Sequence, residues 1–165
     1  MPKKIETFHM LKRFLMLATL LAALAACTGD RPYNESADAK ANIRQALSEA
    51  KAENLPVIVI FGANWCEECR ALSVAIKTGK NAAKIAKEFK VVKVNVGNFD
   101  HNLDIANSYG NPIKGGIPGA AILSPNNNTV VYVTKPGELA SAHNMGDDGL
   151  YDFLKKSSKN VKSSS

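Results

Sequence analysis

Residues 57–69 read VIVIFGANWCEEC, an unbroken apolar run followed by a short turn and two cysteines. The apolar run from Val57 to Phe61 is typical of a strand buried in the centre of a sheet. A segment with helical periodicity follows from Arg70 to Lys77. We therefore expect Cys66 at a helix N-terminus, where N–H groups without helical partners and the helix dipole stabilise negative charge.

The spacing of the two cysteines indicates redox chemistry. Cys69 follows Cys66 by three positions, so on a helix the two side chains share one face and lie within disulfide reach. A thiolate is the nucleophilic form of cysteine, and such a pair can cycle between dithiol and disulfide.

Other interpretations of the cysteine pair are a zinc site, a haem attachment site and a structural disulfide. A zinc site needs four ligands, whereas the histidines His9, His101 and His143 are scattered along the chain. Haem attachment needs a histidine directly after the second cysteine, where this chain has Arg70. A structural disulfide here would close a very short loop and add little stability. Redox cycling is therefore favoured over the zinc site and the structural disulfide.

Residues 1–26 have the pattern of a lipoprotein signal peptide. A basic segment ends with Lys12-Arg13, and an apolar segment too short to span a bilayer stably follows from 14 to 25. Residues 24–27 read LAAC and resemble the bacterial lipobox, in which the cysteine is lipidated and becomes the mature N-terminus. An uncleaved anchor or a plain secretory signal is the alternative, and either would also export the domain.

Lipidation of Cys27 would anchor the protein to a membrane through acyl chains on one residue. The next residue is Thr28 rather than Asp, which by analogy with enterobacterial sorting points to the outer membrane. Residues 27–36 are polar and without periodicity, so we expect a short tether.

The composition is that of a globular protein with one domain. The chain has 165 residues, of which 45% are hydrophobic and 22% charged. Its formal charge of +6 arises partly within residues 1–26, which contain Lys3, Lys4, Lys12 and Arg13. The balance that is left is too small to indicate a nucleic-acid partner.

Helical and strand patterns alternate along the chain, with helices expected at 37–53, 70–77, 82–89, 103–109 and around 150–154, and strands at 57–61, 91–96, 120–123 and 130–134. A parallel crossover core followed by a hairpin, with helices on both faces, predicts an α/β fold: a three-layer α/β/α sandwich with a central mixed sheet. We expect this domain to cover 37–156 and a flexible polar tail to cover 157–165.

The chain resembles the thioredoxin superfamily over roughly residues 37–156. A strand leads into Trp65-Cys66-x-x-Cys69 and a helix, and Gly116-Ile117-Pro118 opens the later hairpin. In detail it is most similar to exported thioredoxin-like proteins of bacteria, including lipoproteins, whose activities range over disulfide reduction, isomerisation and cytochrome maturation.

The resemblance implies a role for each matching residue. Cys66 corresponds to the nucleophile, and Cys69 to the resolving cysteine that attacks Cys66 to release reduced substrate. Pro118 corresponds to the cis-proline that faces the cysteines, and the backbone of Ile117 would bind an extended substrate peptide. Trp65 would flank the site, with packing in the core as its alternative.

Two departures from the family pattern concern the tuning of the cysteines. Thioredoxins carry a buried Asp, thought to help deprotonate the resolving cysteine, where this chain has Ile60; Lys93 matches its companion lysine and is either functional or solvated. Glu67 and Glu68 replace Gly-Pro and disfavour a nearby thiolate, whereas Arg70 or Lys93 would favour it. We expect a reduction potential nearer about −270 mV than about −120 mV.

We therefore expect a membrane-anchored thiol–disulfide oxidoreductase of the bacterial envelope, a reductant or isomerase of protein disulfides without a cofactor. Because the periplasm is held oxidising, a membrane electron donor is expected to keep it reduced. The alternative is a non-catalytic binding module that holds copper or a client protein. His143 and Met145 lie before the last helix without ligand spacing, so we predict loop surface there and no metal site.

Overall fold

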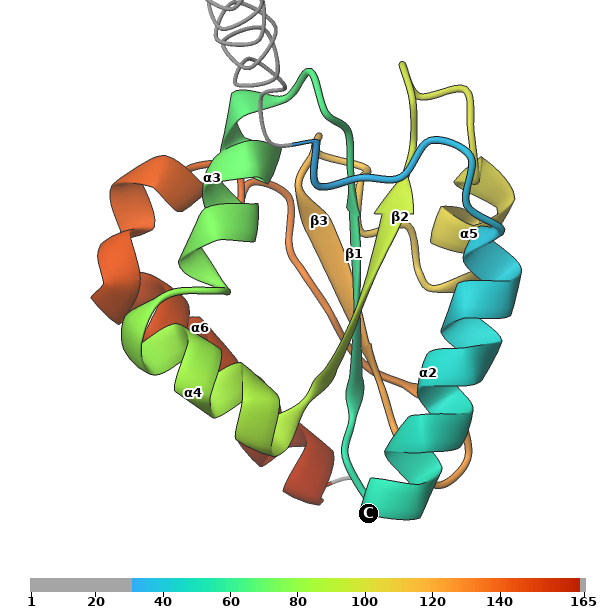
Figure 1. Ribbon diagram of the computed structural model, residues 1–165, viewed down its shortest axis with the longest axis vertical. Helices are drawn as coiled ribbons and strands as arrows, with labels where there is room; N and C mark the ends of the chain where they lie inside the picture. The colour runs from blue at the N-terminus through green and yellow to red at the C-terminus, as the bar shows by residue number, and fades with distance from the viewer. Residues whose placement is uncertain (1–30, 164–165) are drawn as a thin grey trace, which may run out of the picture. The chain divides into compact units, whose positions relative to one another are not determined.

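The computed structural model describes residues 31–163 (Figure 1). The predicted signal peptide and the predicted lipidation site, Cys27, lie outside the described residues. Within residues 31–163, no helix has both the length and the apolar character needed to cross a membrane.

A four-stranded mixed sheet forms the centre of the domain, with the strand order β2-β1-β3-β4. Strand β1 is parallel to β2 and antiparallel to β3, and β3 and β4 form the predicted antiparallel hairpin. The strands are β1 Val57–Gly62, β2 Lys90–Asn95, β3 Gly119–Leu123 and β4 Val130–Val133.

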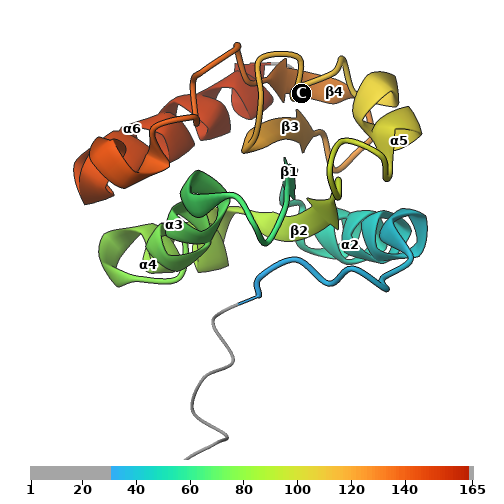
Figure 2. The ribbon, with the colours of Figure 1, turned by 90° about the horizontal axis from the view of Figure 1, so that it is seen from above.

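Helices cover both faces of this sheet, as seen from above in Figure 2. One face carries α2 (Ala39–Glu53) and α5 (Leu103–Ser108). The other face carries α3 (Glu67–Ala75), α4 (Gly79–Glu88) and α6 (Ala142–Ser163). The three-layer sandwich predicted from the sequence is therefore confirmed.

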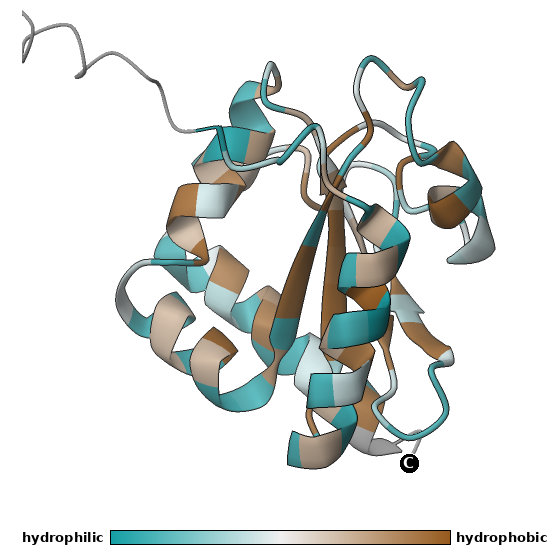
Figure 3. Cartoon of the chain, turned by 45° about the vertical axis from the view of Figure 1, so that its right-hand side comes forward, coloured by the Kyte–Doolittle hydropathy of each residue, from teal (hydrophilic) through white to brown (hydrophobic). Residues whose placement is uncertain are grey.

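Strand β1 contributes to both hydrophobic cores, which explains its unbroken apolar sequence. Val57, Val59 and Phe61 pack in the core beneath α2 and α5. Ile58 and Ile60 pack in the core beneath α3 and α6. In Figure 3 the strands are accordingly mostly hydrophobic, apart from the hydrophilic residues of β2, whereas α2 alternates between hydrophobic and hydrophilic residues.

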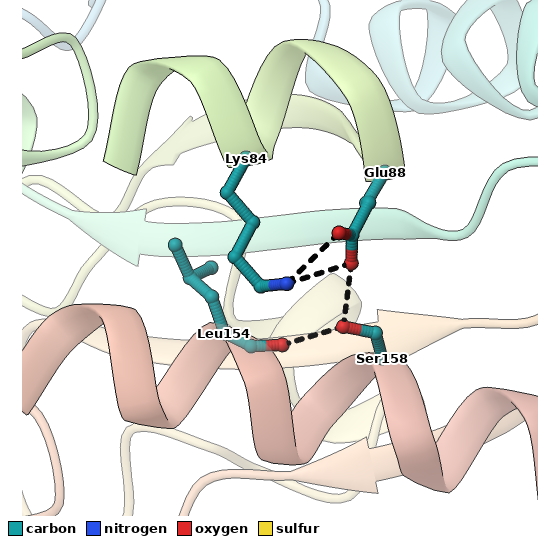
Figure 4. A network of polar contacts seen from close by, with 4 residues as sticks. All are labelled: Lys84, Glu88, Leu154 and Ser158. Atoms are coloured by element: carbon teal, nitrogen blue, oxygen red, sulfur yellow. Dashed lines mark hydrogen bonds and ion pairs between the residues drawn. The ribbon is translucent and has the colours of Figure 1, made fainter. Parts of the chain in front are cut away.

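The flexible tail predicted at 157–165 is wrong for residues 157–163, because α6 continues to Ser163; residues 164–165 lie outside the described residues. Ser157 and Val161 are buried, and Val161 belongs to the core beneath α3 and α6. Figure 4 shows the polar contacts that hold this part of α6 against α4. The Glu88 carboxylate accepts from Lys84 Nζ at 2.9 Å, and the Ser158 hydroxyl lies 2.8 Å from Glu88 Oε2 and 2.9 Å from the Leu154 carbonyl oxygen.

The predicted tether at 27–36 is also wrong for its last residues, because Tyr33 belongs to the core beneath α2. Its side chain is only 2% exposed. Its backbone N–H donates to Asn64 Oδ1 at 2.9 Å, and Asn64 Nδ2 donates to the Tyr33 carbonyl at 2.8 Å. The folded domain therefore includes a residue ahead of the predicted boundary at Ala37.

Candidate active site

The turn after β1 places Cys66 at the N-cap of α3, as the sequence predicts. Its backbone is extended, and its sulfur accepts the Cys69 backbone N–H at 3.4 Å. The Arg70 guanidinium donates to the carbonyl of Asn64 at 2.8 Å and so braces the turn. Cys66 is 8% exposed and Cys69 fully buried, and both are free thiols.

A second loop, far away in the sequence, completes the site. The Cys66 sulfur lies 3.6 Å from the carbonyl oxygen of Ile117, to which its S–H can donate. The Ile117–Pro118 peptide bond is cis, which agrees with the position that the resemblance gives to Pro118. The structure thus brings Cys66, Cys69 and the Ile117-Pro118 dipeptide together.

Cys69 has an environment that opposes ionisation. Burial raises the pKa of the Cys69 thiol well above its ordinary range, and the adjacent Cys66 adds to the rise. A backbone hydrogen bond from Ala63 and the hydroxyl of Tyr33 act in the opposite direction. Cys69 is therefore held as a neutral thiol and needs help to become a nucleophile.

Tyr33 is a site residue that sequence reasoning missed. Its hydroxyl and the Cys69 sulfur both lie against the backbone of Gly62. Burial is the main cause that raises the pKa of Tyr33, and the neighbouring Cys69 adds to the rise. Two features of the sequence could have pointed to Tyr33: it is an aromatic residue in a polar segment, and Gly62 at the end of the apolar run is typical of a place where another group approaches the backbone closely. Neither signal shows that the two residues meet, because this contact depends on the tertiary fold.

Lys93 and Ile60 are paired neighbours on β2 and β1. Ile60 is buried in the core beneath α3, so no carboxylate occupies this place. The Lys93 ammonium donates to the Ser73 hydroxyl and lies 5.9 Å from the centre of the Tyr33 ring. Lys93 is thus half-buried near the site rather than a fully solvated strand residue.

The two glutamates between the cysteines have different surroundings. Glu67 is exposed, whereas Glu68 Oε2 accepts the backbone N–H of His143 at 2.8 Å. His143 lies in the first turn of α6 rather than in the predicted loop, although its side chain is exposed as expected. Glu68 therefore joins α3 to α6 in addition to any effect on the cysteines.

Trp65 lies on the surface beside Cys66, so the alternative that it packs in the core is wrong. It is 56% exposed, and its indole N–H donates to the Gly97 carbonyl at 2.8 Å. Its ring lies 6.3 Å from the ring of Phe99, which is also exposed. The two aromatic rings form an apolar surface next to the motif.

Between residues 31 and 163, no three side chains of His, Cys, Asp or Glu are grouped in a way that could hold a metal ion. His101, in the loop after β2, contacts Asp100 through its Nδ1 atom at 2.6 Å.

Comparison with known proteins gives a consistent assignment. A thioredoxin-like family model matches residues 38–125. A crystal structure described as disulphide isomerase from Xylella fastidiosa Temecula1 is 47% identical, with a TM-score of 0.74, over 77% of this chain and 96% of that one. A thioredoxin from Thermus thermophilus shares the fold at 18% identity, with a TM-score of 0.54, over 72% of this chain and 85% of that one. No curated protein matches the chain significantly. The chain belongs to the thioredoxin-like family.

Proposed function

We propose that the protein is a thiol–disulfide oxidoreductase that exchanges its Cys66 and Cys69 thiols with disulfides of protein substrates. One observation carries the proposal: Cys66 is a helix N-cap whose sulfur accepts the N–H of the second cysteine of the pair. This position favours a thiolate and holds Cys69 within reach of it. The similar Xylella protein, described as a disulphide isomerase, supports the same chemistry.

The reaction proceeds by two exchanges. The Cys66 thiolate attacks one sulfur of the substrate disulfide, and the other substrate sulfur leaves as a thiolate. The new bond is a mixed disulfide between Cys66 and the substrate. Cys69 then loses its proton and attacks the Cys66 sulfur, which forms the Cys66–Cys69 disulfide and releases the second substrate sulfur with the bonding electrons. The substrate is reduced by two electrons, and the protein is oxidised by two.

The surroundings of Cys66 suit an extended polypeptide. The Ile117 carbonyl already contacts the Cys66 sulfur, so a peptide paired with the backbone of Ile117 and Pro118 would bring its own sulfur to Cys66. Trp65 and Phe99 offer exposed aromatic surface for apolar side chains of the substrate. These contacts favour a protein substrate over a small disulfide.

We assign the protein to the reducing or isomerising direction. The similar Xylella protein is described as a disulphide isomerase, which supports this direction. Turnover as a reductant in an oxidising compartment needs an electron donor, which we place in the membrane. A redox titration of the full chain tests both the exchange and its direction.

We also propose that the protein works in the bacterial envelope as a lipoprotein anchored through Cys27. The proposal is supported by the lipobox-like sequence at 24–27 at the end of an apolar segment. Expressed in a bacterium fed labelled palmitate, the wild-type chain is expected to incorporate label, and a Cys27→Ala variant is not. Equal labelling of the two proteins, or of neither, would contradict anchoring at this residue.

A further inference from the structure

The Tyr33 hydroxyl and the Cys69 sulfur meet above the backbone of Gly62. A Cβ atom built on Gly62 would lie 2.8 Å from the Cys69 sulfur and closer still to the Tyr33 hydroxyl. Both distances are shorter than real Cβ contacts allow, so only glycine leaves room for the two groups together. The last residue of β1 thus creates the space in which a phenol and a thiol face each other.

Tyr33 is held at this position by the turn that carries Cys66. Its backbone exchanges two hydrogen bonds with the side chain of Asn64, and the carbonyl of Asn64 accepts from Arg70. The Tyr33 side chain is 2% exposed, so water does not compete for its hydroxyl. Tyr33, which precedes α2 in the chain, therefore places one fixed hydrogen-bond donor on the buried side of the Cys66–Cys69 pair.

The protonation states of the two groups decide which one donates the hydrogen bond. Burial raises the pKa of Tyr33 above its already high ordinary value, so the phenol keeps its proton and can only donate to a thiolate. The same bond lowers the pKa of Cys69 against the effect of burial. Further titratable groups of the described residues near this contact are Cys66, which raises the pKa of Cys69, and Lys93, whose ammonium lies 5.9 Å from the centre of the Tyr33 ring. Ile60 offers no carboxylate.

We propose that Tyr33 is a catalytic residue of the second exchange, in which its hydroxyl donates a hydrogen bond to the sulfur of Cys69 and stabilises the attacking thiolate. This inference rests on the thiol–disulfide exchange proposed above. The Cys69 thiolate supplies the electron pair of the new bond to Cys66, and the released substrate sulfur takes the pair of the broken bond. The proton lost by Cys69 balances the one that the released thiolate takes up, and Tyr33 retains its own.

Dithionitrobenzoate separates the two exchanges, because one thionitrobenzoate is released by Cys66 attack and a second by Cys69 resolution. In the full chain with Cys27→Ser, Tyr33→Phe is expected to slow the second release about tenfold, as removal of a hydrogen bond to a charged group does. The first release should change less than about twofold, since the variant leaves Cys66 and its N-cap contact in place. Tyr132→Phe is the matched control, because that hydroxyl bonds to Glu138 rather than to a cysteine.

A second measurement detects the hydrogen bond without any substrate. With Cys66→Ser as well, Cys69 is the single thiol, and its pKa is read from the pH dependence of its ¹³Cβ chemical shift. Tyr33→Phe should raise this pKa, whereas a purely structural role of the ring would leave it unchanged. Asn64→Ala, at a half-buried side chain that positions Tyr33, should shift the pKa and the second release in the same direction by a smaller factor.

The inference is overturned if Tyr33→Phe folds and neither the second release nor the Cys69 pKa changes, or, should that variant not fold, if Asn64→Ala changes neither. Failure of the proposed function looks different: the wild-type chain would then form no mixed disulfide at all. In that case the pKa measurement on the single-thiol protein still decides whether Tyr33 stabilises the Cys69 thiolate.

Discussion

Replacement of Cys66 by alanine is expected to lower the rate of protein-disulfide reduction by a factor on the order of 10³ or more, because the attacking nucleophile is lost. The fold should persist, since the substitution removes only one sulfur at a helix N-cap from the core beneath α2 and α5 and does not touch the core beneath α3 and α6. The rate is measured by the reduction of insulin with dithiothreitol as the electron source. Cys27→Ala is the matched control and should retain the wild-type rate.

Replacement of Cys69 gives a different result when the reduced protein is mixed with insulin in the absence of dithiothreitol. Cys69→Ala keeps the attack by Cys66 but cannot resolve the mixed disulfide, so a covalent complex with the substrate should accumulate. Non-reducing electrophoresis detects this complex. Dithiothreitol added afterwards should reduce the mixed disulfide and release the substrate. Wild-type turnover in Cys66→Ala would contradict the role of Cys66 as the nucleophile. A complex that still forms in the Cys66→Ala Cys69→Ala protein would show that substrate binding does not depend on exchange.

Removal of residues 157–165 is expected to lower the free energy of unfolding by about 3–6 kcal/mol. The truncation exposes the core surface that Val161 covers, worth about 1.5–3 kcal/mol for a buried side chain. It also removes the Ser158 hydroxyl from the Glu88 carboxylate, a hydrogen bond to a charged group worth about 1.5–3 kcal/mol. Urea unfolding followed by circular dichroism measures the loss.

A shorter truncation serves as the control for this experiment. Removal of residues 163–165 keeps Ser158 and Val161 and should change the unfolding free energy by less than about 0.5 kcal/mol. Equal stability of the two truncated proteins would contradict the buried packing of the end of α6.

The sheet and the cysteine pair were predictable because both depend on local sequence. The apolar run Val57–Phe61 is typical of a doubly buried strand, and its alternate residues do pack in two different cores. The Cys66–Cys69 spacing fixes both thiols on one turn of helix once the strand before them is assigned. Val92, Val94 and Val96 occupy alternate positions of the predicted strand at 91–96, and all three are buried in the same core.

The rest of the site depends on contacts between residues far apart in the chain. Tyr33 lies among polar residues in the sequence, yet it is buried in the core and its backbone is bound by Asn64, 31 positions away. Glu68 meets His143 across 75 positions. The end of α6 has a polar sequence, and its serines become buried only against α4. Patterns of hydrophobicity carry no information on such pairings.

Thiol–disulfide exchange by the Cys66–Cys69 pair is tested most directly by the redox equilibrium of the full chain in glutathione and dithiothreitol buffers. Fluorescence of Trp65, the single tryptophan, and alkylation of the thiols follow the Cys66–Cys69 pair. We predict a reversible two-electron transition at a potential below about −160 mV, on the reducing side of the strong oxidants. A higher potential would contradict the reducing or isomerising direction, and a pair that never forms a disulfide in any buffer would contradict thiol–disulfide exchange itself.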